Sequence, residues 1–356
     1  MALPKTQQAL LVKEVGKPIQ LVTNHPVPQP GPDQILLKVT VAGFNPHDGK
    51  ARNTGLFIAQ NLPALLTNDV VGTVVAYGPG VNKYQIGDRV LSHAGFTGNY
   101  SQNGLQQYAV NDIGAGFKIP DSISDDEAAT LPTSIIAPLV GLFDDENGIG
   151  IPAPWTKAAK TFDYKSTAIL IVGGGSNCGK FAVQLAKLAG LGTIIAVGGS
   201  EQELKNYGAT DVLDRHGGEK VVLERIRKVI GDNLNYVFDA VNLPVDQTLG
   251  LNAMSRSKKG KMARLLPPSV VPPGTVDGDK EVDNPAGFEV FDVLGLSQIK
   301  PNLTYPFWDR VPDYLTSGEI KPLGVTVKEG LTAENANAVL DAYRDGKMVQ
   351  KTHIHV

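Results

Sequence analysis

The sequence predicts an α/β protein in two parts: a β-rich domain and a second, doubly wound domain built on a parallel sheet. Two observations support this fold class. Short apolar runs separated by turn residues fill roughly the first 130 residues, whereas strands and helices alternate from Thr167 to Leu294. We therefore expect one domain over residues 1–130 and 301–356 and the other over residues 131–300.

The β-rich part is predicted from its turns. Apolar runs at 34–43, 70–77 and 89–91 each adjoin a turn that contains glycine, and two of these turns also contain proline. The sheet they form is expected to be mostly antiparallel. The C-terminal part predicts two helices and a last strand, over Val311–Ser317, Ala333–Arg344 and Thr352–Val356.

The second part alternates between apolar strands and amphipathic helices. Helices between the earlier strands, such as Lys180–Ala189, make βαβ units and hence a parallel sheet. A segment rich in proline, glycine and aspartate, Pro267–Gly287, is expected to be a surface loop. The six predicted strands are Ala168–Val172, Thr193–Val197, Asp211–Leu213, Tyr236–Ala240, Met262–Leu266 and Phe288–Leu294.

A glycine cluster joins the first of these strands to the helix that follows it. Such a turn directs backbone N–H groups and the positive end of the helix dipole at one point, which suits a pyrophosphate. The spacing G-x-G-x-x-x-G also occurs in purely structural turns. The nucleotide site predicted here is lined by Gly173, Gly174, Gly175, Ser176, Asn177, Cys178 and Gly179.

The end of the second strand indicates which dinucleotide is preferred. A carboxylate there would bind the ribose 2′-hydroxyl of NAD, but this chain has Gly198-Gly199-Ser200. Small residues leave room for a 2′-phosphate, to which Ser200, Lys205 and Arg215 could contribute hydrogen bonds and positive charge. The predicted cofactor is therefore NADPH. Glu201 is an alternative ribose ligand, and Lys205 and Arg215 could equally be solvated.

Six short motifs follow in order along the chain: Asn45-Pro46-His47-Asp48, Asp69–Val74, Ile86–Val90, Gly104–Tyr108, Glu127–Pro132 and Ser317–Pro322. Together they resemble the medium-chain dehydrogenase/reductase superfamily, and in particular its zinc-independent branch of quinone oxidoreductases and enoyl reductases. The resemblance implies a GroES-like catalytic domain and a Rossmann cofactor domain. Fungal stand-alone enoyl reductases of secondary metabolism look especially similar.

The resemblance also implies that no metal is bound. Zinc-dependent members have a cysteine where this chain has Asn45, and a His-Glu pair where it has Asn68-Asp69. His93 and Asp69 would be two isolated ligands, which do not make a tetrahedral site. The single cysteine, Cys178, excludes a four-cysteine structural site and an intrachain disulfide.

The function that the resemblance implies is hydride transfer from NADPH to an activated C=C bond, as in an enone or enoyl thioester, or to a quinone. A carbonyl reductase or alcohol dehydrogenase on the same fold is one alternative. A non-redox relative that only binds nucleotide is another. Ala137, where many relatives have a threonine, and Ser176-Asn177, in place of two glycines, keep the last alternative open.

Asn45 is implied as the polar group nearest the nicotinamide and the substrate, with a loop-capping role as the alternative. His47 and Lys50 are candidate donors to a developing oxyanion, although either could be solvated. Asp48 is expected to hold the loop by accepting backbone N–H bonds. Tyr100 is expected in a substrate lid or at a loop tip. Two further residues are assigned to the cofactor site, Val241 and Leu294.

Composition limits the partners. The formal net charge of −3 gives no reason to expect nucleic acid or an anionic membrane as a partner. The N-terminus lacks the apolar core of a signal peptide, so a cytoplasmic location is expected. We expect a small-molecule substrate, free or bound to a carrier, and a monomer or a homodimer.

Overall fold

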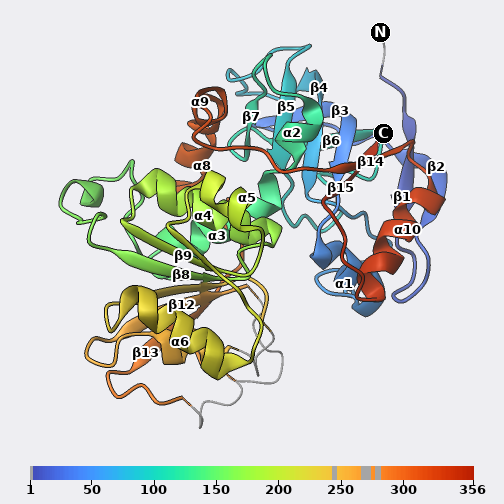
Figure 1. The fold of residues 1–356 in the computed structure, drawn as a ribbon. Helices are drawn as coiled ribbons and strands as arrows, with labels where there is room; N and C mark the ends of the chain where they lie inside the picture. The colour runs from blue at the N-terminus through green and yellow to red at the C-terminus, as the bar shows by residue number, and fades with distance from the viewer. Residues whose placement is uncertain (1–2, 243–246, 266–273, 277–281) are drawn as a thin grey trace. The chain divides into compact units, whose positions relative to one another are not determined.

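The computed structural model describes residues 3–242, 247–265, 274–276 and 282–356. The chain forms two compact units (Figure 1). We call Met1–Thr133, Leu296–Gly318 and Pro322–Val356 the β-rich unit. We call Ser134–Gly295 and Glu319–Lys321 the parallel-sheet unit.

A seven-stranded sheet is the centre of the β-rich unit. Its order is β14-β15-β3-β4-β5-β7, and β6 pairs with β3 outside this path. The pairs are antiparallel except that of β14 with β15. A two-stranded sheet accompanies it. The strands are β1 (Thr6–Leu11), β2 (Gln20–Pro26), β3 (Gln34–Gly43), β4 (Asp69–Tyr77), β5 (Arg89–His93), β6 (Tyr108–Asp112), β7 (Gly116–Lys118), β14 (Thr326–Glu329) and β15 (Thr352–His355).

Segments far apart in the sequence meet in this sheet. The last strand, β15, pairs with β3, so that a red strand lies beside a blue one in Figure 1. Five helices accompany the described part of this sheet: α1 (Pro46–Thr54), α2 (Asp125–Ala129), α8 (Pro301–Trp308), α9 (Val311–Ser317) and α10 (Ala333–Arg344).

Helices α9 and α10 have the predicted bounds, but α1 lies in a segment that the sequence predicted to be a loop. Its buried residues include the polar Asp48 and Arg52, so it shows no apolar stripe. It is held instead by tertiary packing. A Cβ added to Gly49 would lie 2.7 Å from Cβ of Tyr343 in α10, so the two helices touch at a position that only glycine can occupy.

The parallel-sheet unit has six strands in the order β10-β9-β8-β11-β12-β13, and every pair is parallel. Counted from the start of the unit this is the order 3-2-1-4-5-6 of a Rossmann fold. The predicted fold class is therefore confirmed. The strands are β8 (Ala168–Val172), β9 (Thr193–Val197), β10 (Asp211–Leu213), β11 (Tyr236–Asp239), β12 (Gly260–Arg264) and β13 (Phe288–Asp292).

Helices cover both faces of this sheet, and the central strand β8 is buried along its whole length. The helices of the described part are α3 (Pro132–Phe143), α4 (Asn177–Ala189), α5 (Glu201–Tyr207), α6 (Glu219–Ile230) and α7 (Thr248–Ala253). Helix α4 begins three residues earlier than predicted, because Ser176 caps it. The predicted loop Pro267–Gly287 falls mostly outside the described residues.

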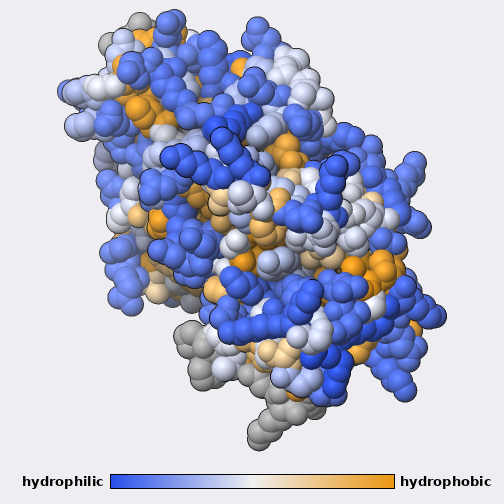
Figure 2. Space-filling view, turned by 90° about the vertical axis from the view of Figure 1, so that its left-hand side faces the viewer, coloured by the Kyte–Doolittle hydropathy of each residue, from blue (hydrophilic) through white to orange (hydrophobic). Residues whose placement is uncertain are grey.

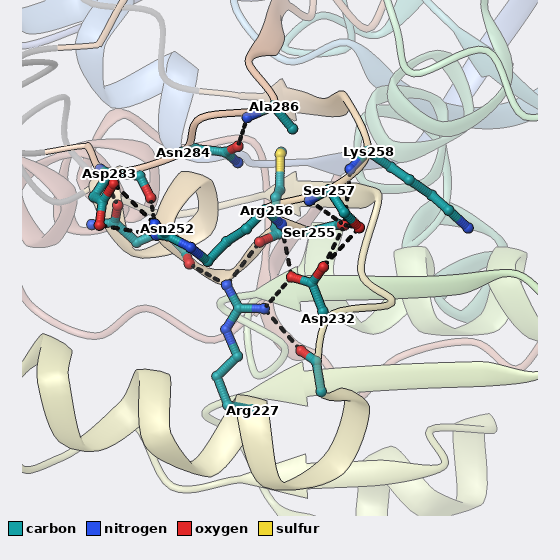
Figure 3. A network of polar contacts seen from close by, with 12 residues as sticks. Arg227, Asp232, Asn252, Ser255, Arg256, Ser257, Lys258, Asp283, Asn284 and Ala286 are labelled. Carbon is teal, nitrogen blue, oxygen red and sulfur yellow. Dashed lines mark hydrogen bonds and ion pairs between the residues drawn. The ribbon is translucent and has the colours of Figure 1, made fainter.

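A polar network closes the amino edge of the parallel sheet (Figure 3). The Asp232 carboxylate accepts hydrogen bonds from the backbone of Arg256 at 2.7 Å and from the hydroxyls of Ser257 at 2.8 Å and Ser255 at 3.1 Å. Arg227 of α6 donates to two carbonyls at the end of α7. These side chains join α6 and α7 to the segment that leads into β12. In doubly wound sheets of this order, ligands bind at the opposite, carboxyl edge.

The face shown in Figure 2 is mostly hydrophilic, and its apolar residues form separate patches. Within the described residues, no helix combines the length and apolar character needed to cross a membrane.

Candidate functional site

The first candidate region is the glycine turn between β8 and α4, at the carboxyl edge of the parallel sheet. Gly173 has a φ of +81°, a conformation that favours glycine. A Cβ at Gly175 would lie 2.8 Å from Cα of Gly199, and one at Gly179 would lie 2.2 Å from the Gly173 carbonyl oxygen. The three glycines therefore have separate roles. Gly173 turns the chain, Gly175 allows close packing against Gly199, and Gly179 allows the start of α4 to pack against the turn. The first and third of these roles are also those of the glycines in the Rossmann fingerprint, whereas Gly175 packs against Gly199.

Ser176 is the N-cap of α4. Its Oγ accepts a hydrogen bond from the Gly179 N–H at 3.0 Å and donates one to the Gly173 carbonyl at 2.9 Å. Asn177 and Cys178 follow as the first two helical residues. The structure thus uses the Ser176 hydroxyl to stabilise the turn, rather than directing it at a phosphate, while the helix dipole remains aimed at the turn.

The end of β9 lies against this turn. Gly198 and Gly199 both have positive φ, and Ser200 caps α5 through a hydrogen bond from the Glu203 N–H. Ser200 is exposed, and none of the three residues Gly198, Gly199 and Ser200 carries a carboxylate. Lys205 is engaged elsewhere, because its Nζ donates to the Thr210 carbonyl.

Arg215 is the cation that the structure places beside these glycines. A Cβ at Gly198 would lie 3.3 Å from Cδ of Arg215, and the Arg215 side chain is exposed. Val241 also reaches the turn, since a Cβ at Gly173 would lie 2.4 Å from its Cγ2. Leu294 is partly exposed and precedes Gly295, which packs against Ala137.

The second candidate region is a buried polar cluster in the β-rich unit, formed by Asn45, Asp69 and Lys351. Asn45 Nδ2 donates to Asp69 Oδ2 at 2.8 Å. Lys351 Nζ donates to Asn45 Oδ1 at 3.0 Å and forms an ion pair with Asp69 Oδ2. The other carboxylate oxygen of Asp69 accepts two bonds from Thr133, from its N–H at 2.8 Å and its hydroxyl at 2.7 Å.

Charge decides the ionisation of this cluster. Burial alone would raise the pKa of the Asp69 carboxyl, but attraction to Lys351 and His93 and the hydrogen bonds of Lys351 and Thr133 lower it to about 2. Burial lowers the pKa of His93, which faces Asp69 across β4 and β5, to about 4. At neutral pH Asp69 is therefore a carboxylate and the neighbouring His93 is a neutral imidazole.

The structure places the other predicted residues of this region around α1. Asp48 accepts bonds from the backbone N–H groups of Asn45 at 2.8 Å and Thr67 at 2.9 Å, which confirms its predicted role in holding the backbone. His47 Nε2 contacts Asn68 Oδ1 at 3.0 Å. Lys50 is exposed on α1, and contacts within the described residues do not join it to the cluster.

Tyr100 is neither a lid nor a loop tip. Its side chain is only 6% exposed and belongs to the apolar core that also contains Leu105 and Ile58. The expectation of an exposed position, in a lid or at a loop tip, was wrong, because the polar composition of residues 95–104 gave no sign that this one aromatic side chain packs into the core.

Known proteins show the same architecture. A family model described as "Alcohol dehydrogenase GroES-like domain" matches residues 31–138, and one described as "Zinc-binding dehydrogenase" matches residues 178–264. Dehydrogenase orsE of Emericella nidulans is 30% identical over 347 residues, which cover 93% of this chain and 94% of orsE. The chain belongs to the medium-chain dehydrogenase/reductase superfamily. It is therefore an oxidoreductase of that superfamily.

Two further proteins resemble this chain along most of its length. Trans-enoyl reductase himH of Aspergillus japonicus is 29% identical over 334 residues, covering 91% of this chain and 90% of himH. A mycobacterial protein solved in complex with NADPH superimposes with a TM-score of 0.73 at 22% identity, covering 98% of this chain and 100% of that chain.

The donor set of this member does not fit a zinc site. Zinc is held by thiolates, imidazoles and carboxylates. In the polar cluster the one carboxylate, Asp69, is already satisfied by Lys351, Asn45 and Thr133. Among the described residues there is no group of three or more His, Cys, Asp or Glu that could hold a metal ion.

Lys351, Thr133 and Ser297 are the site residues that sequence reasoning missed. Lys351 and Asn45, which form a hydrogen bond, are 306 residues apart in the sequence. Ser297 Oγ lies 2.8 Å from His93 Nδ1, and these two residues are 204 apart in the sequence. Lys351 stands directly before a predicted last strand, but no local pattern marks it as buried, because lysine side chains are usually exposed. Its partners could not be deduced without the pairing of β15 with β3.

Proposed function

We propose that this protein is an NADPH-dependent, zinc-independent reductase that transfers a hydride to an activated C=C bond, as in an enone or enoyl thioester, or to a quinone. The observation that carries the proposal is the Asn45–Asp69–Lys351 cluster. It offers an oriented hydrogen-bond donor, supported by a buried charge pair, in place of a metal.

The glycine turn supports the choice of cofactor. Its close backbone packing and helix N-terminus fit a pyrophosphate, and the residues at the end of β9 fit a 2′-phosphate better than a bare 2′-hydroxyl. Arg215 is the cation beside that end. The mycobacterial structure with NADPH, which has the same fold, agrees with this choice.

NADPH, when bound, supplies the hydride from its nicotinamide ring. In our proposal the side-chain amide of Asn45 donates a hydrogen bond to the oxygen on which negative charge collects as an enone or quinone is reduced. His47 is a half-buried imidazole one turn away from Lys50 on the same helix, and it is the better placed of the two for a proton-transfer role, since Lys50 faces solvent. The trans-enoyl reductase himH is a relative with this kind of activity by name.

The experiment that tests the proposal is anaerobic consumption of NADPH and NADH, followed by absorbance, with a quinone, a 2-enal, an enoyl thioester and a simple ketone as acceptors. Products are identified by NMR. A saturated C–C product or a quinol, with NADPH preferred, supports the proposal. An alcohol product would replace it by carbonyl reduction. Tight NADPH binding without consumption of any acceptor would favour a non-redox role instead.

A further inference from the structure

The register of the sheet brings Lys351 to Asn45. His353 of β15 pairs with Gly43 of β3, and the ladder continues with a bond of 2.9 Å from the Phe44 N–H to the Thr352 carbonyl. One step further along this antiparallel register, Lys351 stands opposite Asn45. Gly43 itself pairs with Asp69 of β4, so the cluster lies where the ends of three neighbouring strands, β15, β3 and β4, come together.

The cluster is tightly packed and buried. A Cβ at Gly43 would lie 3.0 Å from Cβ of Asp69 and 3.3 Å from His353. Lys351 is 1% exposed, Asp69 is fully buried and Asn45 is 3% exposed. A long, flexible lysine side chain is therefore immobilised with its charge inside the unit, where an ammonium is expensive to place unless it is paired.

The chemistry of the two partners decides which way the Asn45 carboxamide points. An ammonium has only donors, so the atom of Asn45 that faces Lys351 must be the oxygen. An ionised carboxylate has only acceptors, so the atom that faces Asp69 must be the nitrogen. One N–H of the amide is thus used by Asp69, and the second N–H is the one that remains to serve a ligand.

The Lys351 ammonium also changes the strength of that donor. Withdrawal of electron density from Oδ1 by an ammonium makes the amide N–H groups more acidic, an effect that is larger in a buried, low-dielectric site than in water. An asparagine held only by neutral groups would lack both the fixed direction and this polarisation.

We propose that Lys351 is a positioning residue: its buried ammonium orients and polarises the Asn45 carboxamide so that one N–H is directed at an oxygen of the reacting ligand. The inference rests on the proposed function, in which Asn45 donates to that oxygen. According to this inference, the ligand atom that contacts Asn45 is a hydrogen-bond acceptor, such as a carbonyl or phenolate oxygen.

The test uses a charge-neutral pair of substitutions. Lys351→Met together with Asp69→Asn removes both buried charges and so avoids an unpaired carboxylate. Lys83→Met together with Asp309→Asn removes another ion pair of the same unit, whose N–O distance is 2.8 Å, and serves as the matched control. For each variant we measure kcat, KM for the acceptor, the Kd of NADPH and the thermal midpoint.

We expect kcat of the Lys351→Met/Asp69→Asn variant to fall about 100-fold, the loss typical of one oxyanion donor, with the Kd of NADPH unchanged within about threefold. Asn45→Ala is expected to cause a similar loss, and adding it to the double variant should cause little further loss, because Lys351 acts through Asn45. The control should keep its kcat. A kcat within about threefold of the parent, or losses that multiply in the triple variant, would overturn the proposal.

A readout without turnover separates this inference from the proposed function. The two Nδ2 protons of Asn45 should give separate, slowly exchanging NMR signals in the parent protein, and these should shift and exchange faster in the double variant. If the parent reduces no acceptor, the proposed function fails, and these signals alone decide the role of Lys351. Unchanged signals would overturn it.

Discussion

The glycine turn of the parallel-sheet unit is made of backbone, whereas the polar cluster of the β-rich unit is made of side chains. In the turn, Gly173, Gly175 and Gly179 are required because they have no side chain, since a Cβ at any of them would clash with neighbouring atoms. In the cluster, Asn45, Asp69 and Lys351 act through charges and hydrogen bonds that satisfy one another. A site made of backbone should tolerate changes in charge and fail with added volume. A site made of side chains should show the opposite sensitivity.

The largest effect is expected for Lys351→Met alone. This change leaves the Asp69 carboxylate buried without its ammonium, and breaking one side of a buried pair costs about 3–5 kcal/mol in the free energy of unfolding. Urea unfolding monitored by fluorescence measures it. The Lys351→Met/Asp69→Asn variant should recover most of this loss, and failure to recover would show that volume, not charge, is what matters there.

The pH dependence of stability should identify the same pair. The folded-state pKa of Asp69, about 2, lies below its unfolded value, so its contribution is complete above pH ~4 and is lost as the pH falls through about 2. Unfolding free energies measured between pH 2 and pH 5 should therefore decline toward acid more steeply in the parent than in the double variant. Parallel curves for the two proteins would contradict this.

The next effect concerns the turn. Alanine at Gly179 would place its Cβ 2.2 Å from the Gly173 carbonyl oxygen. Although alanine favours helices by about 1 kcal/mol over glycine, we expect a net destabilisation of about 1–3 kcal/mol, together with weaker NADPH binding. Calorimetry and thermal unfolding measure the two. Gly98→Ala is the control, because a Cβ there meets nothing within 4 Å.

The smallest effect is expected at Ser200, where the turn region depends on a side chain. Aspartate is as good an N-cap as serine, so Ser200→Asp should leave α5 intact while its charge opposes a 2′-phosphate. We expect the preference for NADPH over NADH to fall about tenfold, or ~1.4 kcal/mol, measured from the two Kd values. Asn233→Asp, which adds the same charge at the amino edge of the sheet, should leave the ratio unchanged.

Sequence reasoning found the elements that have local signals and missed one that depends on tertiary contacts. Helices α9 and α10 and strands β8, β9 and β10 were predicted with the bounds that the structure has, because their apolar periodicity and glycine ends are local signals. Helix α1 was predicted as a loop, because Gly49 and the polar buried residues Asp48 and Arg52 make sense only against Tyr343 and the neighbouring loops.

The sequence by itself determined the parallel sheet, the glycine turn and the absence of a carboxylate at the end of β9, because each is encoded within a few consecutive residues. It also singled out Asn45, through the motif Asn45-Pro46-His47-Asp48. Only the tertiary structure decided what holds Asn45, since Lys351 reaches it from 306 positions away through the pairing of β15 with β3. A strand register between the two ends of a chain is a property of the folded sheet, and a single sequence has no local pattern that reveals it.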